Sequence, residues 1–104
     1  MARKLPSVDT TATPLIRSLG DLGKVVRNQR AQSQMRIDDA AALSFVSSDV
    51  LSRLENGKPI TLDKLLLVLD GLGLRMWVAP VKDIAQVELA LHPTDGTAPQ
   101  PRHD

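Results

Sequence analysis

Apolar residues recur through residues 14–73 at the spacing of three and four that places them on one face of an α-helix. The first run follows Pro14 and consists of Leu15, Leu19, Leu22 and Val26. Two glycines interrupt it, each costing a helix about 1 kcal/mol relative to alanine. We therefore expect the main helix to begin at Ser18 or Asp21 and to continue to about Ala31.

Two short helices joined by a tight turn are predicted within residues 35–57, MRIDDAAALSFVSSDVLSRLENG. The first spans Ile37 to Leu43 and carries two aspartates in its first turn, where carboxylates favour the positive end of the helix dipole. Ser47 is a good N-cap for the second. The core-facing residues of the second helix are Val50, Leu51 and Leu54. Gly57 can adopt the left-handed conformation that ends it.

A fourth helix is predicted after Pro59, with Thr61 as its N-cap. Its apolar stripe consists of Leu62, Leu65, Leu66, Leu69 and Leu72. Ile60 is placed to form a hydrophobic staple against this helix. Gly71 and Gly73 end it.

The period then changes from helical to alternating. Leu74, Met76 and Val78 fall on one side of residues 74–81, and Arg75, Trp77 and Ala79 on the other. Such alternation indicates a β-strand. Residues 86–91 are compatible with a second strand or with the end of a short helix.

These elements predict a mainly α fold. A helical domain of four to five helices occupies residues 14–73, and an extension with the strand occupies residues 74–91. Residues 1–13 lack periodicity and are expected to form a flexible arm. Residues 92–104 contain three prolines and are expected to be a disordered tail.

Composition narrows the class of protein. There are no cysteines, so disulfide frameworks and thiolate metal sites are excluded. No apolar run approaches the roughly 20 residues of a membrane span, and the N-terminus lacks the apolar centre of a secretory signal. We expect a cytoplasmic protein without membrane partners. An enzyme is not expected, because both histidines lie in the tail and no phosphate loop, metal-ligand spacing or activated nucleophile is present, so no cofactor is predicted.

Charge is unevenly distributed although the net charge is only +1. Residues 1–36 carry seven basic and two acidic residues, whereas residues 37–104 carry six basic and ten acidic residues. A chain with this asymmetry can present a basic face to a polyanion.

The helix after Ser47 offers a polar face suited to DNA. Ser48, Asp49, Ser52 and Arg53 cluster on one side when wound at about 100° per residue. Short hydroxyl side chains allow close approach to the phosphate backbone. An arginine can bind the O6 and N7 atoms of guanine, which is worth about 1–3 kcal/mol of discrimination.

Residues from about Leu19 to Leu72 resemble the phage-repressor type of helix-turn-helix family, the XRE or Cro/C1-type class. The match includes the length of the motif, Ala41 at its small-residue position, Ser47, and the ending from Val50 to Gly57. The resemblance implies that the second helix of the pair enters the DNA major groove.

The resemblance also implies roles for individual residues. The base-contacting positions are Ser48, Asp49, Ser52 and Arg53, with Ser52 also near the backbone. The phosphate-contacting positions are Arg36, Ser47, Asn56 and Lys58. Arg30 and Glu55 would form an internal ion pair that ties the first helix to the recognition helix.

Three departures from the family pattern stand out. Phe45 occupies a turn position that is often glycine, so either the turn differs or Phe45 has a packing role. Ile37 replaces a frequent glutamine at the start of the first motif helix. Asp49 is a carboxylate facing a polyanion, and it could accept from cytosine N4, oppose binding, or only cap its helix.

The strand after the last helix resembles HipB-type antitoxins, in which this strand pairs with that of a second subunit. A lone strand leaves backbone groups unpaired, and pairing with its two-fold mate is the shortest remedy. Leu74, Met76, Trp77 and Val78 would then form the dimer strand. Dimerisation would also place two recognition helices about 34–36 Å apart. A hairpin with residues 86–91 is the competing remedy, and the two can coexist.

The sequence therefore predicts a dimeric, sequence-specific repressor that binds double-stranded operator DNA. The resemblance implies that it is the antitoxin of a HipBA-like pair, with a HipA-like serine/threonine kinase toxin as partner and autoregulation of the shared operon. The alternatives are a stand-alone or prophage regulator of the same fold, or a protein-interaction module that has lost DNA binding.

Overall fold

The computed structural model describes residue 8 and residues 13–91. Within them the protein is mainly helical and contains no strand. The elements are α1 (Leu19–Gln32), α2 (Ile37–Leu43), α3 (Ser48–Glu55), α4 (Leu62–Gly71), the short 3-10 helix η1 (Val81–Asp83) and α5 (Ile84–Leu91). The expected arm and tail lie outside the described residues, apart from Val8 and Thr13.

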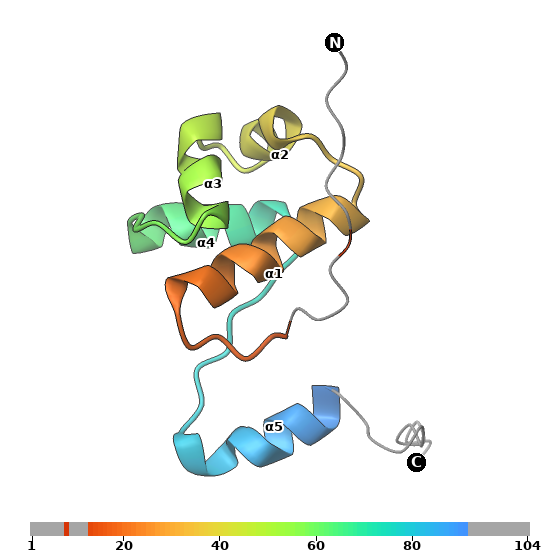
Figure 1. Ribbon diagram of the computed structural model, residues 1–104, viewed down its shortest axis with the longest axis vertical. Helices are drawn as coiled ribbons and strands as arrows, with labels where there is room; N and C mark the ends of the chain where they lie inside the picture. Colours follow the sequence, from red (N-terminus) through yellow and green to blue (C-terminus); the bar gives the residue numbers. More distant parts are fainter. Residues whose placement is uncertain (1–7, 9–12, 92–104) are drawn as a thin grey trace.

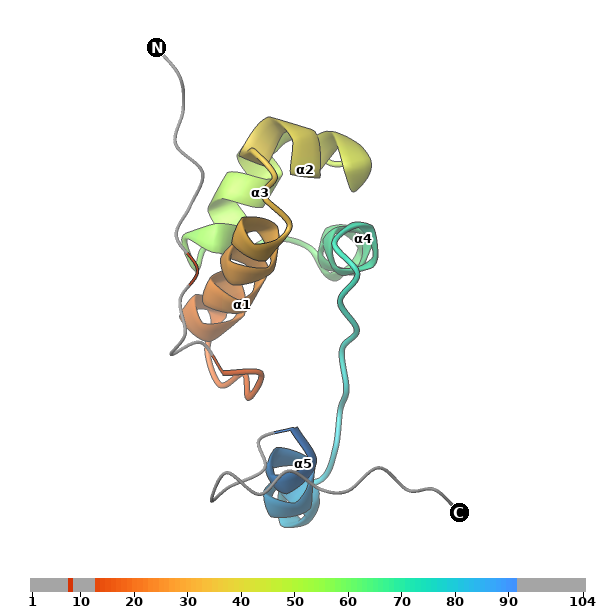
Figure 2. The ribbon, with the colours of Figure 1, turned by 90° about the vertical axis from the view of Figure 1, so that its right-hand side faces the viewer.

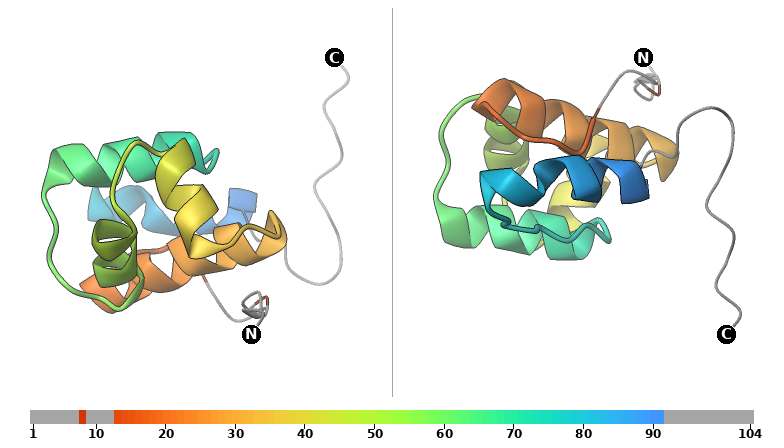
Figure 3. Two further views of the ribbon diagram at one scale, coloured as in Figure 1. Left: turned by 90° about the horizontal axis from the view of Figure 1, so that it is seen from above. Right: turned by 90° about the horizontal axis from the view of Figure 1, so that it is seen from below.

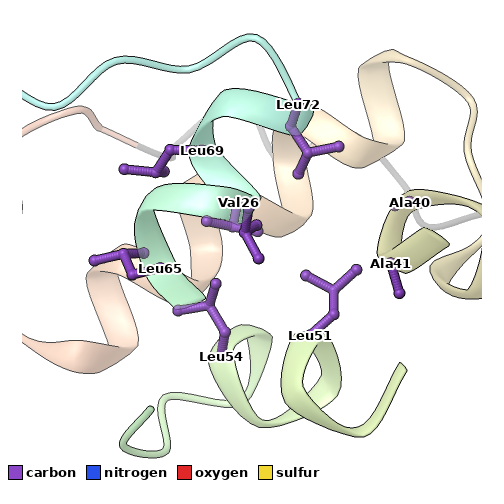
Figure 4. Packing of buried hydrophobic residues seen from close by; sticks show 9 residues of the cluster. Val26, Ala40, Ala41, Leu51, Leu54, Leu65, Leu69 and Leu72 are labelled. Atoms are coloured by element: carbon purple, nitrogen blue, oxygen red, sulfur yellow. The ribbon is translucent and has the colours of Figure 1, made fainter. Parts of the chain in front are cut away.

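Helices α1 to α4 pack together, and α5 lies apart from them at the end of an extended segment (Figure 1). Seen from above, α1 and α4 run side by side, and α2 and α3 lie across them (Figure 3, left). The core contains Val26 of α1, Ala40 and Ala41 of α2, Leu51 and Leu54 of α3, and Leu65, Val68, Leu69 and Leu72 of α4 and its C-cap. Figure 4 shows these side chains converging between the helices.

The start of α1 matches one of the two expected positions. Ser18 is the N-cap, and its hydroxyl oxygen accepts a hydrogen bond from the Asp21 N–H at 3.1 Å. Residues 13–17 precede the helix, so Pro14 does not begin it, although the Thr13 hydroxyl accepts a bond from the Leu15 N–H. The cap satisfies one of the unpaired amides at the helix start.

The buried stripe of α4 differs from the prediction. Leu65, Val68, Leu69 and Leu72 are buried, whereas Leu62 and Leu66 are exposed. The leucine-rich run LDKLLLVLDG supports more than one helical stripe. Packing against α2 and α3 selects the stripe that contains the β-branched Val68, so the predicted set was wrong at two positions.

Helices α1 to α4 all end in the same backbone motif. The residue after each C-cap has a positive φ: Gln34 (55°), Phe45 (60°), Gly57 (74°) and Gly73 (76°). The next residue donates its N–H back to the carbonyl five positions earlier, as in the Schellman motif. Three of these next residues, Met35, Val46 and Leu74, pack against the core. Each helix stop is therefore fixed by local hydrogen bonds and, in three cases, by an apolar anchor.

The expected strand is not present in this single chain. Residues 74–80 lie in neither helix nor strand, and residues 84–91, which the sequence left open, form α5. Figure 2 shows the extended segment holding α5 away from the bundle, and Figure 3 (right) shows α5 beneath α1 and α4. A strand needs a partner to complete its hydrogen bonds, and no second strand lies beside residues 74–80 within the described residues.

At residue 8 and over residues 13–91, no helix is both long enough and apolar enough to cross a bilayer.

Candidate nucleic-acid interface

The outer face of α3 carries the four residues predicted to contact bases. Leu51 and Leu54 are buried on the inner face. Asp49 and Arg53 are exposed, and Ser48 and Ser52 are partly exposed. The Ser47 hydroxyl oxygen accepts a bond from the Val50 N–H at 3.1 Å, which starts the helix. The structure thus brings the predicted base-contacting residues together on one accessible surface.

The side chains of three of these four residues have partners within the chain, and Ser52 is one of them: its hydroxyl oxygen accepts from the Asn56 side-chain amide at 3.5 Å. The Ser48 hydroxyl donates to a carboxylate oxygen of Asp38 at 2.8 Å, which joins the first turns of α2 and α3. The Arg53 guanidinium donates through Nη2 to the Pro59 carbonyl at 3.0 Å. A guanidinium has five N–H donors and a hydroxyl has two acceptor lone pairs, so Ser48 and Arg53 keep capacity for a ligand.

The predicted phosphate-contacting residues flank this face. Arg36 is the N-cap of α2 and is exposed, and Lys58 is exposed after the end of α3. Ser47 is exposed, and its hydroxyl keeps a donor because the cap uses only the oxygen. The Asn56 side-chain amide donates to the Ser52 carbonyl at 2.8 Å and to the Ser52 hydroxyl oxygen at 3.5 Å, and its own carbonyl oxygen can accept from another partner.

Arg27 is a further exposed cation near the predicted phosphate-contacting residues, and it was not among those predicted from the sequence. A hollow between α1, α2 and α3 is lined by Arg27, Arg30, Ile37, Ser52, Glu55 and Asn56. Arg27 is exposed, whereas Arg30 is buried and already paired. The available signal was its position three residues before Arg30, which places both on one side of α1. A phosphate in this hollow would meet a cation and two polar side chains.

The ion pair expected between Arg30 and Glu55 is present. Nε and Nη2 of Arg30 donate to the two carboxylate oxygens of Glu55 at 2.7 and 2.8 Å, a bidentate arrangement. The side chains are only 9% and 6% exposed. Nη1 of Arg30 also donates to the Met35 carbonyl at 3.0 Å. The pair therefore fixes α3 against α1 and the α1–α2 connection.

The charge on this face is mixed. The exposed cations are Arg27, Arg36, Arg53 and Lys58, and the exposed carboxylates are Asp38, Asp39 and Asp49. The small positive balance favours a polyanion only weakly over long range. If this face binds DNA, hydrogen bonds to bases and close approach of the short hydroxyl side chains would therefore contribute most of the preference for one DNA sequence over another.

The turn before α3 settles one question that the sequence left open. Phe45 adopts the left-handed conformation usual for glycine, so the turn does not differ to accommodate it. Its ring is 83% exposed, and so it has no packing role among the described residues. Ile37, the other departure, is partly buried against the core.

The residues predicted for the dimer strand divide into two groups. Leu74 packs against the core of its own chain, and its N–H closes the end of α4. Met76, Trp77 and Val78 are exposed, as are Val81, Leu89 and Leu91 farther along. Leu74 therefore anchors the segment to its own subunit, and the apolar surface begins at Met76.

Among the described residues, the Asp63 carboxyl group has a lowered pKa. The Thr61 hydroxyl donates to the Asp63 carboxylate and is the main reason that the pKa of Asp63 lies below its ordinary value of 3.8. The Lys64 backbone N–H acts in the same direction. Asp63 lies in the first turn of α4, where a carboxylate favours the positive end of the helix dipole.

Within the described part of the chain, no three His, Cys, Asp or Glu side chains are close enough to hold a metal ion. Comparison of the sequence with protein-family models and with curated proteins finds no match.

Proposed function

We propose that this protein is a dimeric repressor that binds operator DNA through α3, in the manner of the Cro/C1-type helix-turn-helix class. The observation that carries the proposal is the geometry of α2, its turn and α3. Ala41, Leu51 and Leu54 are buried where the two helices meet, and the opposite face of α3 presents hydroxyl, carboxylate and guanidinium groups. Such a face can read base edges while the flanking cations hold phosphates.

The phosphate contacts are assigned to Arg27, Arg36, Lys58 and the hydroxyl of Ser47. In this arrangement the ion pair of Arg30 and Glu55 holds the floor of the α1–α3 hollow in place. Arg53 is assigned to bases, so three cations of each subunit, Arg27, Arg36 and Lys58, would neutralise phosphates. Counterion release then predicts that log K falls with log salt at a slope of about −5 for a dimer.

The dimer is supported by the exposed apolar side chains that follow α4. Trp77 and Val78 are 81% and 89% exposed on a segment without secondary structure, which is unfavourable for a chain alone in water. Pairing of residues 75–79 with the same residues of a second copy would complete their backbone hydrogen bonds and cover these side chains. α5 would then lie against the partner subunit.

The test is an electrophoretic shift of the DNA upstream of its own gene, at low and physiological salt, with scrambled DNA as competitor. Specific binding that weakens as salt rises is expected. Arg53→Ala should lose the preference for this DNA without a change in melting temperature, because the Arg53 side chain is exposed and its hydrogen bond to the Pro59 carbonyl is an exposed one. Lys64→Ala, which removes an exposed lysine of α4 outside the proposed DNA contacts and the dimer segment, should bind as the unchanged protein does.

The antitoxin role rests on the resemblance to HipB-type proteins alone. It predicts that a serine/threonine kinase copurifies with this protein when their neighbouring genes are expressed together. A protein that binds its operator but retains no kinase would be a stand-alone regulator. A folded dimer without affinity for DNA at any salt concentration would be an interaction module.

A further inference from the structure

We infer that Phe45 is a specificity-determining residue that contacts thymine methyl groups at the edge of the major groove. This inference rests on the proposed function and extends it to a residue outside α3. It begins from the backbone of the α2–α3 turn, where Phe45 has a φ of 60°.

The surrounding structure imposes this conformation. Phe45 donates its N–H to the Ala42 carbonyl at 3.2 Å, and Val46 donates to the Ala41 carbonyl at 3.1 Å. Val46 is anchored against the core. A bulky residue in the left-handed region is uncommon because its Cβ crowds the following carbonyl. Glycine adopts this conformation more readily. Gly57 and Gly73 occupy the equivalent positions at the ends of α3 and α4.

The Phe45 ring does not contribute to the packing of the core. It is 83% exposed, so its removal would uncover no core surface. Strained positions of this kind are typical of residues that contact another molecule. Leu43, the last residue of α2, is also exposed and adds aliphatic surface to the same turn.

The place of Phe45 in the chain, directly before α3, favours DNA over a protein as its partner. Phe45 precedes the N-cap Ser47 by two residues, and the first turn of α3 carries Ser48 and Asp49. When the start of α3 enters the groove, the turn before it lies at the lip of the groove. The 5-methyl group of thymine is the apolar feature of the major-groove edge, and phenylalanine is among the side chains that contact it. A protein seated on the ring would compete with DNA for the same end of α3.

The test compares Phe45→Gly with the unchanged protein on a duplex selected by the unchanged protein from a random 20-base-pair pool. Phe45→Gly should raise the melting temperature by about 4 °C, because the strain is relieved, and should weaken binding of the selected duplex. Gln34→Gly is the matched control: it relieves the same left-handed conformation at the far end of α1. It should also raise the melting temperature and should leave binding unchanged. Phe45→Asn, which tolerates the left-handed conformation, should weaken binding as Phe45→Gly does.

The methyl contact is tested by replacing each thymine of the selected duplex with deoxyuridine, which lacks only that methyl group. At one or two positions the unchanged protein should lose about fourfold in affinity, the value of one buried methyl group. At those positions Phe45→Gly should show no further loss.

Two results would overturn the inference while leaving the proposed function intact. Phe45→Gly could bind the selected duplex as tightly as the unchanged protein, or it could bind more weakly without coupling to any thymine methyl. Loss of the dimer in Phe45→Gly, with unchanged affinity per dimer, would assign the ring to a protein contact and would also overturn it. Failure of the unchanged protein to enrich any duplex would defeat the proposed function as well.

Discussion

At Gly23 the backbones of α1 and α3 approach closely. A Cβ placed there would lie 2.5 Å from the Leu54 carbonyl oxygen and 2.7 Å from the Glu55 carbonyl oxygen. Only glycine allows the C-terminal end of α3 to rest on α1 at this distance. The sequence marked Gly23 only as a cost to the helix, because the need for it arises from a contact between elements about 30 residues apart. Ser47 and Gly57, by contrast, were predictable, since capping depends on neighbours in the chain.

Gly23→Ala should destabilise the fold by about 2 kcal/mol, because the added methyl group must push α3 away from α1. The free energy of unfolding in urea measures this. Gly20→Ala is the matched control on the same helix, with only the Ser18 hydroxyl near its Cβ, at 3.7 Å. It should stabilise by up to about 1 kcal/mol through helix propensity. Equal effects of the two substitutions would show that the close approach at Gly23 is absent in solution.

Thr61→Val should raise the pKa of Asp63 toward its ordinary value, because the hydroxyl that donates to the carboxylate is removed. A lowered carboxyl pKa stabilises the folded state above pH about 4, and this stabilisation is lost as the pH falls through the lowered pKa. Thr61→Val should therefore lose less stability on acidification than the unchanged protein. An NMR titration of the Asp63 carboxyl carbon measures the shift, and Thr61→Ser should preserve it. An unaltered pKa in Thr61→Val would refute the hydroxyl as its cause.

At the scale of elements, the chain encodes where each helix begins and ends more fully than which face it buries. α2 spans Ile37–Leu43 and α3 follows the cap at Ser47, as predicted. The buried stripe of α4 was misassigned because a leucine-rich helix has several equivalent stripes. The alternation over residues 74–81 predicted a strand that the described residues do not form, because local patterning does not supply the neighbouring strand that a β-strand needs. Arg27 was not predicted as a contact residue, because the sequence shows only a cation on a helix and not the hollow between α1, α2 and α3 that it lines.

The packing of α1 against α3 should depend on Arg30 and Glu55 being present together or absent together. Glu55→Leu should cost about 3 kcal/mol or more, because Arg30 would remain buried without its partner. The double substitution Arg30→Met with Glu55→Leu should recover most of that loss, since neither charge is then buried. Urea unfolding of the two single variants and the double variant gives the coupling. A double variant that loses the sum of both single losses would contradict this account.

At the scale of the whole molecule, the protein consists of a packed helical bundle and an exposed apolar extension. The bundle buries its core from four helices, whereas no residue of α5 is buried. A helix of eight residues is marginal in water without tertiary contacts. The exposed apolar side chains of the extension therefore suit a protein–protein interface. In our proposal the partner is a second copy of this chain.

Val78→Asp should convert the dimer to a monomer without unfolding the bundle, because Val78 is exposed and lies four residues beyond the core anchor Leu74. Sedimentation velocity measures the mass, and circular dichroism at 222 nm checks that the helices remain. Leu67→Asp, an exposed position on α4, is the control and should remain dimeric. A dimer of Val78→Asp with unchanged affinity would place the interface elsewhere.

The extended segment after Leu74 also bears on how long a molecule of this protein survives. Backbone that is exposed and outside regular structure is where proteases cut, and residues 75–78 have both properties. Pairing of this segment with a second copy would shield it. Turnover would then depend on abundance, because scarce chains are unpaired and open to cleavage while plentiful chains protect one another. If residues 75–79 pair as proposed, loss of the protein would therefore accelerate once its synthesis stops.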